Sequence, residues 1–143
     1  WDDRKRGACW LPQDIFLKHG FDLGNLQPGV SDAKFQAGLA ELLGIAKSHL
    51  QNALIYTSLI PSHEKGIRRF CLWAIGMAIL TLNKINRHRD FSTSAQVKIS
   101  RRSVRATITT TSLLAGYDGA LDLLFKLTSR NLPDIEVHKE IFL

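Results

Sequence analysis

Cysteine is scarce in this sequence, and several motifs that would point to particular chemistries are absent. The two cysteines, Cys9 and Cys71, lie far apart without the spacing of metal ligands, which argues against a secreted disulfide scaffold and a cysteine-based metal site. The sequence contains no Walker motif, zinc-binding signature or catalytic-triad signature. The five histidines do not pair at any ligand spacing. We therefore expect two free thiols and a site of another kind.

Long hydrophobic runs are absent as well. The most apolar segment covers residues 70–82 and falls short of the about 20 residues that a membrane-spanning helix needs. Hydrophobic residues make up 45% of the chain and charged residues 22%, which is typical of a globular protein. A chain of 143 residues suits one domain. We expect a single domain over residues 1–143, in the cytoplasm or peripherally attached to a membrane surface.

Acidic residues are nearly missing from one stretch, and the net charge of +6 is concentrated there. Between residues 84 and 105, the only acid is Asp90 and the only aromatic residue is Phe91. Such a stretch favours an anionic partner: a phosphate, a nucleic acid or an acidic membrane surface. The shortage of aromatic residues argues against stacking on RNA bases. The bases are Lys84, Arg87, Arg89, Lys98, Arg101, Arg102 and Arg105.

Apolar residues recur at steps of three and four, which predicts an all-α fold with three long helices and shorter ones. Ser31 and Ser62 are suitable N-caps, and Pro61 ends the first long helix. The third long helix contains the threonine-rich stretch "TITTTS", and threonine is a mediocre helix former. The long helices are predicted from Ser31 to Pro61, Ser62 to Arg89 and Ser100 to Ser129, with short elements at residues 12–19 and 135–143.

The second long helix is apolar nearly all round, which predicts a central helix packed on several faces. One stripe contains Ile67, Phe70, Cys71, Ala74, Met77, Ala78, Thr81 and Ile85, and the other side contains Leu72, Ile75, Ile79 and Leu82.

Three stretches occur together in a specific order. They are "WDDRKRGACWLPQDIF" (residues 1–16), "RFCLWAIGMAILTL" (69–82) and "VKISRRSV" (97–104). Their order and spacing resemble the C-terminal half of the squalene/phytoene synthase family, the head-to-head prenyl synthases, and squalene synthases most closely. Asp3 matches the last acid of the family's second D-x-x-x-D motif, and Pro12 matches its proline nine residues later. The sequence departs from the usual pattern at Ala8, Ala74 and Ser100.

This resemblance implies a helical isoprenoid-synthase fold of which the chain is the C-terminal half. It implies head-to-head condensation of two farnesyl diphosphates to presqualene diphosphate, followed by NADPH-dependent reduction to squalene. The chain alone is then expected to be inactive, because the first Asp-rich motif belongs to the missing N-terminal half. Alternatives are a phytoene, dehydrosqualene or hydroxysqualene synthase, or, in a different class, a basic helical module that binds nucleic acid or a protein partner.

The resemblance also implies roles for particular residues, although it identifies no certain catalytic residue. Asp2 and Asp3 would bind Mg²⁺, whose preferred ligands are oxygens and which usually bridges to substrate phosphates. Tyr56, Phe70, Cys71 and Gly76 would line an apolar site for the farnesyl chain, because the carbocation must be kept from water. The NADPH phosphate would be bound by Lys98, Arg101 and Arg102. Farnesyl diphosphate, the N-terminal half and a membrane surface are the expected partners, and nucleic acid is not.

Overall fold

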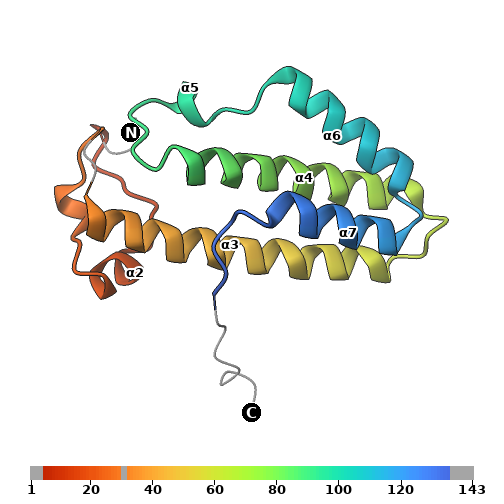
Figure 1. The fold of residues 1–143 in the computed structure, drawn as a ribbon, viewed down its shortest axis with the longest axis horizontal. Helices are drawn as coiled ribbons and strands as arrows, with labels where there is room; N and C mark the ends of the chain where they lie inside the picture. Colours follow the sequence, from red (N-terminus) through yellow and green to blue (C-terminus); the bar gives the residue numbers. More distant parts are fainter. Residues whose placement is uncertain (1–4, 30–31, 136–143) are drawn as a thin grey trace, which may run out of the picture.

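The structure is a computed structural model that describes residues 5–29 and 32–135. The described residues form helices and contain no strand, which confirms the predicted all-α class. Figure 1 shows two long antiparallel helices, α3 and α4, with α6 along α4 and α7 against both. The elements are α2 (Gln13–Lys18), the 3₁₀ turn η1 (Leu23–Asn25), α3 (Ala33–Leu59), α4 (Lys65–Arg87), α5 (Ser94–Val97), α6 (Arg101–Leu114) and α7 (Asp118–Ser129).

The ends of α3 and α4 follow from local sequence signals. The Asp32 side chain accepts hydrogen bonds from the backbone N–H groups of Lys34 and Phe35 and is therefore the N-cap of α3. The cap that we predicted, Ser31, lies outside the described residues. Helix α3 ends at Leu59, because Pro61 favours an extended conformation at the residue before it. Helix α4 begins three residues after the predicted cap, Ser62, and Glu64 occupies its N-cap position.

The third predicted long helix is in fact two helices, α6 and α7. The chain turns at residues 115–117, where Gly116 interrupts the run and Ala115 is buried. The turn lets α7 fold back along α3 and α4 and bury Leu121 and Phe125. The prediction was wrong because apolar periodicity continues across the turn and does not show where a chain reverses. The other predicted element, residues 135–143, lies almost entirely outside the described residues.

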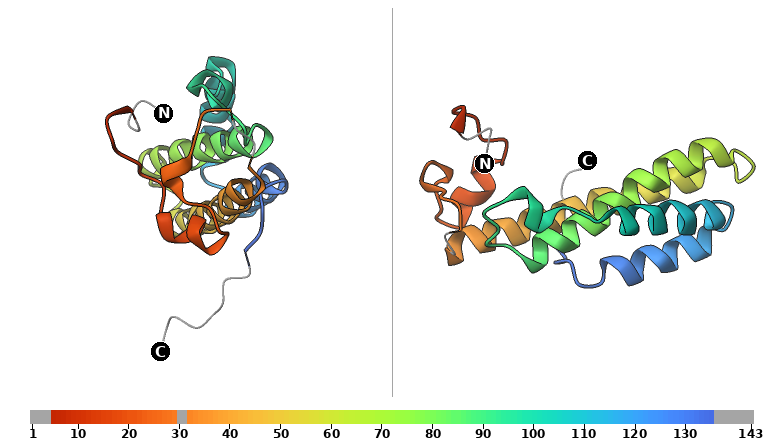
Figure 2. Two further views of the ribbon diagram at one scale, coloured as in Figure 1. Left: turned by 90° about the vertical axis from the view of Figure 1, so that its left-hand side faces the viewer. Right: turned by 90° about the horizontal axis from the view of Figure 1, so that it is seen from above.

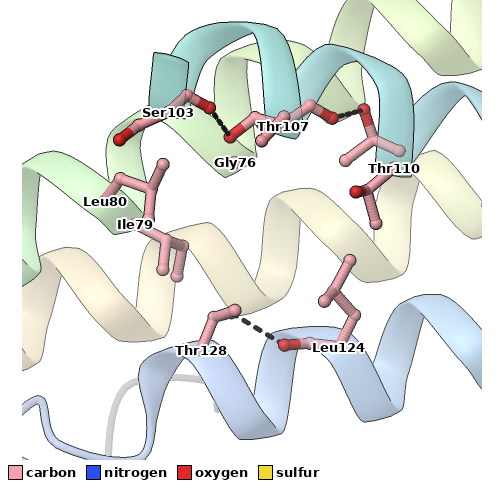
Figure 3. Close-up of a pocket in the computed structure, with 10 residues that line it drawn as sticks. Gly76, Ile79, Leu80, Ser103, Thr107, Thr110, Leu124 and Thr128 are labelled. Atoms are coloured by element: carbon pink, nitrogen blue, oxygen red, sulfur yellow. Dashed lines mark hydrogen bonds between the residues drawn. The ribbon is translucent and has the colours of Figure 1, made fainter. Parts of the chain in front are cut away.

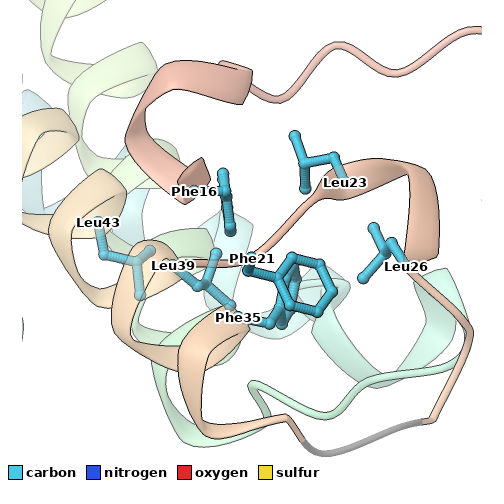
Figure 4. Close-up of a cluster of buried hydrophobic side chains, with 7 residues drawn as sticks. All are labelled: Phe16, Phe21, Leu23, Leu26, Phe35, Leu39 and Leu43. Atoms are coloured by element: carbon cyan, nitrogen blue, oxygen red, sulfur yellow. The ribbon is translucent and has the colours of Figure 1, made fainter. Parts of the chain in front are cut away.

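Two hydrophobic clusters stabilise the fold at different positions along α3. The first joins α2, η1 and the start of α3 (Figure 4), where the rings of Phe16 and Phe35 stack with their centroids 5.2 Å apart. Gly38 permits this packing, because a Cβ atom there would lie 2.7 Å from the Phe16 ring. The second cluster joins the end of α3 to α4 and α7 and consists of Leu54, Leu72, Ile75, Ile79, Ala115, Leu121 and Phe125.

Helix α4 contacts α3, α5, α6 and α7, which confirms the prediction of a central helix packed on several faces. Figure 2 shows α3 and α6 on different sides of α4. Leu72, Ile75 and Ile79 are buried, and Ile85 at the far end of the other predicted stripe packs against the first cluster. The exception is the start of that stripe, where Ile67 and Phe70 are exposed. Periodicity does not distinguish such an exposed apolar surface from a core.

A buried arginine connects three helices near the α3–α4 turn. The Arg68 side chain is 1% exposed, and its Nη2 donates a hydrogen bond to the Asp118 carboxylate in the first turn of α7. Its Nη1 donates to the carbonyl of Ile60 at the end of α3, at 2.8 Å. The Nε atom has no hydrogen-bond partner. Arg68 therefore depends strongly on Asp118, because a buried charge is costly without its partner.

Candidate functional site

The predicted substrate residues Tyr56 and Phe70 lie on one exposed face of the α3–α4 pair. Leu54 on α3 and Leu72 on α4 pack in the cluster that includes Phe125 of α7. Tyr56 and Phe70 are each two positions from these leucines, or about 200° around their helices. Both therefore face away from α7. Their side chains are 69% and 72% exposed, so this side of the pair is an uncovered apolar face.

Cys71 lies at the edge of this face, and Gly76 lies elsewhere. The Cys71 thiol is free and half-buried. Gly76 is six positions after Phe70, which places it about 120° away around α4. A Cβ atom at Gly76 would collide with the Thr107 methyl group, so the glycine allows α4 and α6 to approach closely. Tyr56 and Phe70 are thus exposed and Cys71 is half-buried, whereas Gly76 has a role in helix packing.

The predicted cofactor residues lie at the start of α6. Lys98 follows α5, and Arg101 and Arg102 occupy the first turn of α6; all three are exposed. None forms an ion pair within the described part of the chain. Bases at a helix N-terminus add to the positive end of its dipole, which makes this position attractive to an anion. Arg101 and Arg102 are adjacent and about 100° apart, so they point in different directions.

The predicted metal ligands, Asp2 and Asp3, lie outside the described residues. Within residues 5–29 and 32–135, no group of three or more His, Cys, Asp or Glu side chains is placed to hold a metal ion. The magnesium prediction therefore rests on the oxygen donors of the two carboxylates.

One acid–base cluster connects α2 to α3. A Glu41 carboxylate oxygen accepts a hydrogen bond from Lys18 Nζ at 2.8 Å, and the other lies 2.6 Å from His19 Nε2. The hydrogen bond from Lys18 lowers the pKa of Glu41 from its ordinary value; the contact with His19 acts in the same direction, and burial opposes both. The cluster joins two packed helices, so we interpret it as structural.

The structure also contains two adjoining cavities between α4, α6 and α7 that the sequence did not indicate. One is mostly apolar, with a volume of about 300 Å³, and the other contains basic side chains, with a volume of about 360 Å³. Figure 3 shows the apolar cavity, with Gly76 and Ile79 on α4, Thr107 on α6 and Leu124 on α7. Apolar residues in the third predicted helix were the available signal, but we assigned them to one continuous helix.

Residues 1–103 match the sequence model of the family described as Squalene/phytoene synthase. The chain belongs to the squalene/phytoene synthase family. No curated protein and no solved structure gave a significant match. The described helices are consistent with the helical isoprenoid-synthase fold of this family, as predicted.

Family membership identifies the class of enzyme. Squalene/phytoene synthases are prenyltransferases, and the family suggests head-to-head isoprenoid condensation. The match includes α3, α4 and the bases at the start of α6, whereas α7 and most of α6 lie beyond it. No helix of the described ranges is long and apolar enough to cross a membrane.

Proposed function

We propose that this chain is the C-terminal half of a squalene synthase-like catalytic domain. The complete enzyme would condense two farnesyl diphosphates to presqualene diphosphate and reduce this product to squalene with NADPH. The observation that carries the proposal is the uncovered apolar face with Tyr56 and Phe70, which lies within the family match. A product that is entirely hydrocarbon requires such a surface.

The uncovered face suits one wall of a reaction chamber. Ionisation of an allylic diphosphate produces a carbocation, which must be protected from water. Tyr56 and Phe70 provide aromatic rings, whose faces attract cations, and Ala74 lies one turn after Phe70 on α4. Because these side chains are exposed, the chamber needs a second wall. We assign this wall to the missing N-terminal half.

The diphosphate and the cofactor require positive charge. Asp2 and Asp3 would hold Mg²⁺, which neutralises diphosphate charge when bound. Lys98 and Arg101 lie near the N-terminus of α6 and form no ion pair with the described residues, and they would bind the phosphate of NADPH. NADPH supplies the reducing power for the second step. If the complete enzyme has no such cofactor site, the alternative is that it is a phytoene, dehydrosqualene or hydroxysqualene synthase.

The decisive experiment supplies farnesyl diphosphate and Mg²⁺ to the complete protein, with and without NADPH. We expect presqualene diphosphate without NADPH and squalene with it. Lys98→Ala combined with Arg101→Ala should preserve the condensation and reduce squalene formation about tenfold or more, because charge-assisted hydrogen bonds to the cofactor are lost. The 143-residue chain alone should form no product.

Lys34→Ala combined with Lys126→Ala is the matched control. It removes the same charge from exposed positions on α3 and α7, away from the start of α6, and both steps should remain. Equal loss of both steps in the Lys98 and Arg101 variant would contradict the NADPH assignment. Phytoene or dehydrosqualene as product would favour the alternative, and absence of any condensation product would refute the proposal.

A further inference from the structure

The two cavities between α4, α6 and α7 form one groove with an apolar and a basic half. Leu80, Ser103 and Thr128 line both halves, so the two are continuous. The apolar half extends along α6 towards Thr110 and, on α7, towards Leu124 (Figure 3). Volumes of about 300 and 360 Å³ are within the range of small-molecule sites.

Three of the threonines that line the apolar half have hydroxyl groups that are already satisfied. Thr107 Oγ1 donates to the Ser103 carbonyl at 3.0 Å, and Thr111 Oγ1 donates to the Thr107 carbonyl at 2.7 Å. Thr128 Oγ1 likewise donates to the Leu124 carbonyl at 2.7 Å (Figure 3). Because each hydroxyl bonds to its own helix, these residues contribute little polarity to the groove. A sequence that appears polar thus produces an apolar surface.

The basic half brings three cations to one cavity. Lys84 and Arg87 come from the last turn of α4, and Arg130 follows α7. No carboxylate lines this cavity, and none of the three bases forms an ion pair within the described ranges. Each base stabilises the negative end of its own helix dipole. The interaction with the helix dipoles does not require the three side chains to line the same cavity. Positive charges that lie close together repel one another unless an anion lies between them.

We propose that this groove binds an amphiphile with a phosphate or diphosphate head group. The head group would contact Lys84, Arg87 and Arg130, because arginine and lysine are the usual ligands of phosphate. The apolar chain would enter the half between Ile79 and Leu124. This site is not on the face with Tyr56 and Phe70, since α7 packs on the opposite side of α4 from them. The inference therefore does not rest on the proposed function, and much of the groove lies beyond the family match.

Calorimetric titration of the 143-residue chain with farnesyl diphosphate tests the site. We expect Arg87→Gln combined with Arg130→Gln to weaken binding at least about tenfold, because two charge-assisted contacts are lost. Ala106→Phe should weaken farnesyl diphosphate binding but not inorganic pyrophosphate binding, because Ala106 lines only the apolar half. Arg87→Lys should retain most of the affinity, since it keeps the charge. Circular dichroism checks that each variant is folded.

One control separates the groove from a general effect of charge. Lys34→Gln combined with Arg105→Gln changes the net charge equally at positions that line neither half of the groove, and it should not change the affinity. The proposal fails if the Arg87 and Arg130 variant binds farnesyl diphosphate like the wild type, or if the control variant loses as much affinity.

A second arm of the experiment distinguishes a soluble ligand from a membrane lipid. Phosphatidylcholine vesicles with and without phosphatidic acid are sedimented with the chain. Binding only to the vesicles with phosphatidic acid, lost in the Arg87 and Arg130 variant, would support the site with a lipid head group as the source of phosphate. Binding to farnesyl diphosphate without vesicle binding would support a soluble ligand. Binding to neither probe would overturn the proposal.

Discussion

Replacing Asp118 by asparagine leaves the buried guanidinium group of Arg68 without a counter-charge. The loss of one partner from a fully buried pair typically costs 3–5 kcal/mol, as an order of magnitude. The Asp118 side chain is 53% exposed, so water can solvate this end of the pair. We therefore expect Asp118→Asn to lower the free energy of unfolding by about 2–3 kcal/mol. For a chain of this length, the melting temperature should fall by about 4–12 °C.

The double variant Arg68→Met and Asp118→Asn provides the sharper comparison. A well-packed hydrophobic side chain can replace a buried ion pair at little cost, so the double variant should be more stable than Asp118→Asn alone. Asp122→Asn is the matched control on α7, because Asp122 pairs with Lys126 at an exposed position. It should cost less than about 1 kcal/mol.

Urea unfolding followed by circular dichroism measures all three variants. The reasoning is refuted if Asp118→Asn costs no more than Asp122→Asn. It is also refuted if adding Arg68→Met to Asp118→Asn lowers the stability further. Either result would mean that the Arg68 charge is solvated or compensated in another way.

Two further predictions concern helix packing and pH. Gly76→Ala should lower the free energy of unfolding by about 1–3 kcal/mol because its Cβ would collide with the Thr107 methyl group, and Thr107→Ser should restore part of this loss in urea unfolding. Glu41 has a lowered pKa in the folded state, so its contribution to stability is present above its ordinary pKa and is lost as the pH falls through the folded-state value. Glu41→Gln should lower the free energy of unfolding by about 1 kcal/mol or less at neutral pH. The free energy of unfolding of this variant should also change less with pH in the acidic range. If its pH dependence equals that of the wild type, Glu41 does not have a lowered pKa in the folded state.

The helices were predictable from the sequence where local signals decide the structure. Pro61 ends α3 because its effect is confined to its neighbours. The break at Gly116 was not predictable, because Gly38, Gly44 and Gly76 all lie inside continuous helices. Only the packing of α7 against α3 and α4 distinguishes these cases.

The candidate sites were likewise predictable only in part. Periodicity placed Phe70 and Leu72 on different faces of one helix but did not show which face is buried, because burial depends on the other elements of the fold. The roles of Tyr56 and Phe70 came from the family resemblance and stay predictions. The groove was not visible in the sequence, because the hydrogen bonds that make Thr107 and Thr128 apolar form only in a helix.

The two hydrophobic clusters have a consequence for how the molecule opens. Among the described elements, the two clusters have only α3 and α4 in common, and each cluster packs other elements against a different part of these helices. Separation of α2 and η1 would expose Phe16 and Phe35 but leave Leu72 and Phe125 covered. The end of the molecule that contains Arg68 and the uncovered face can therefore keep its shape while the opposite end loosens. Attachment of another protein segment near α2 would then leave the packing around Phe70 unchanged.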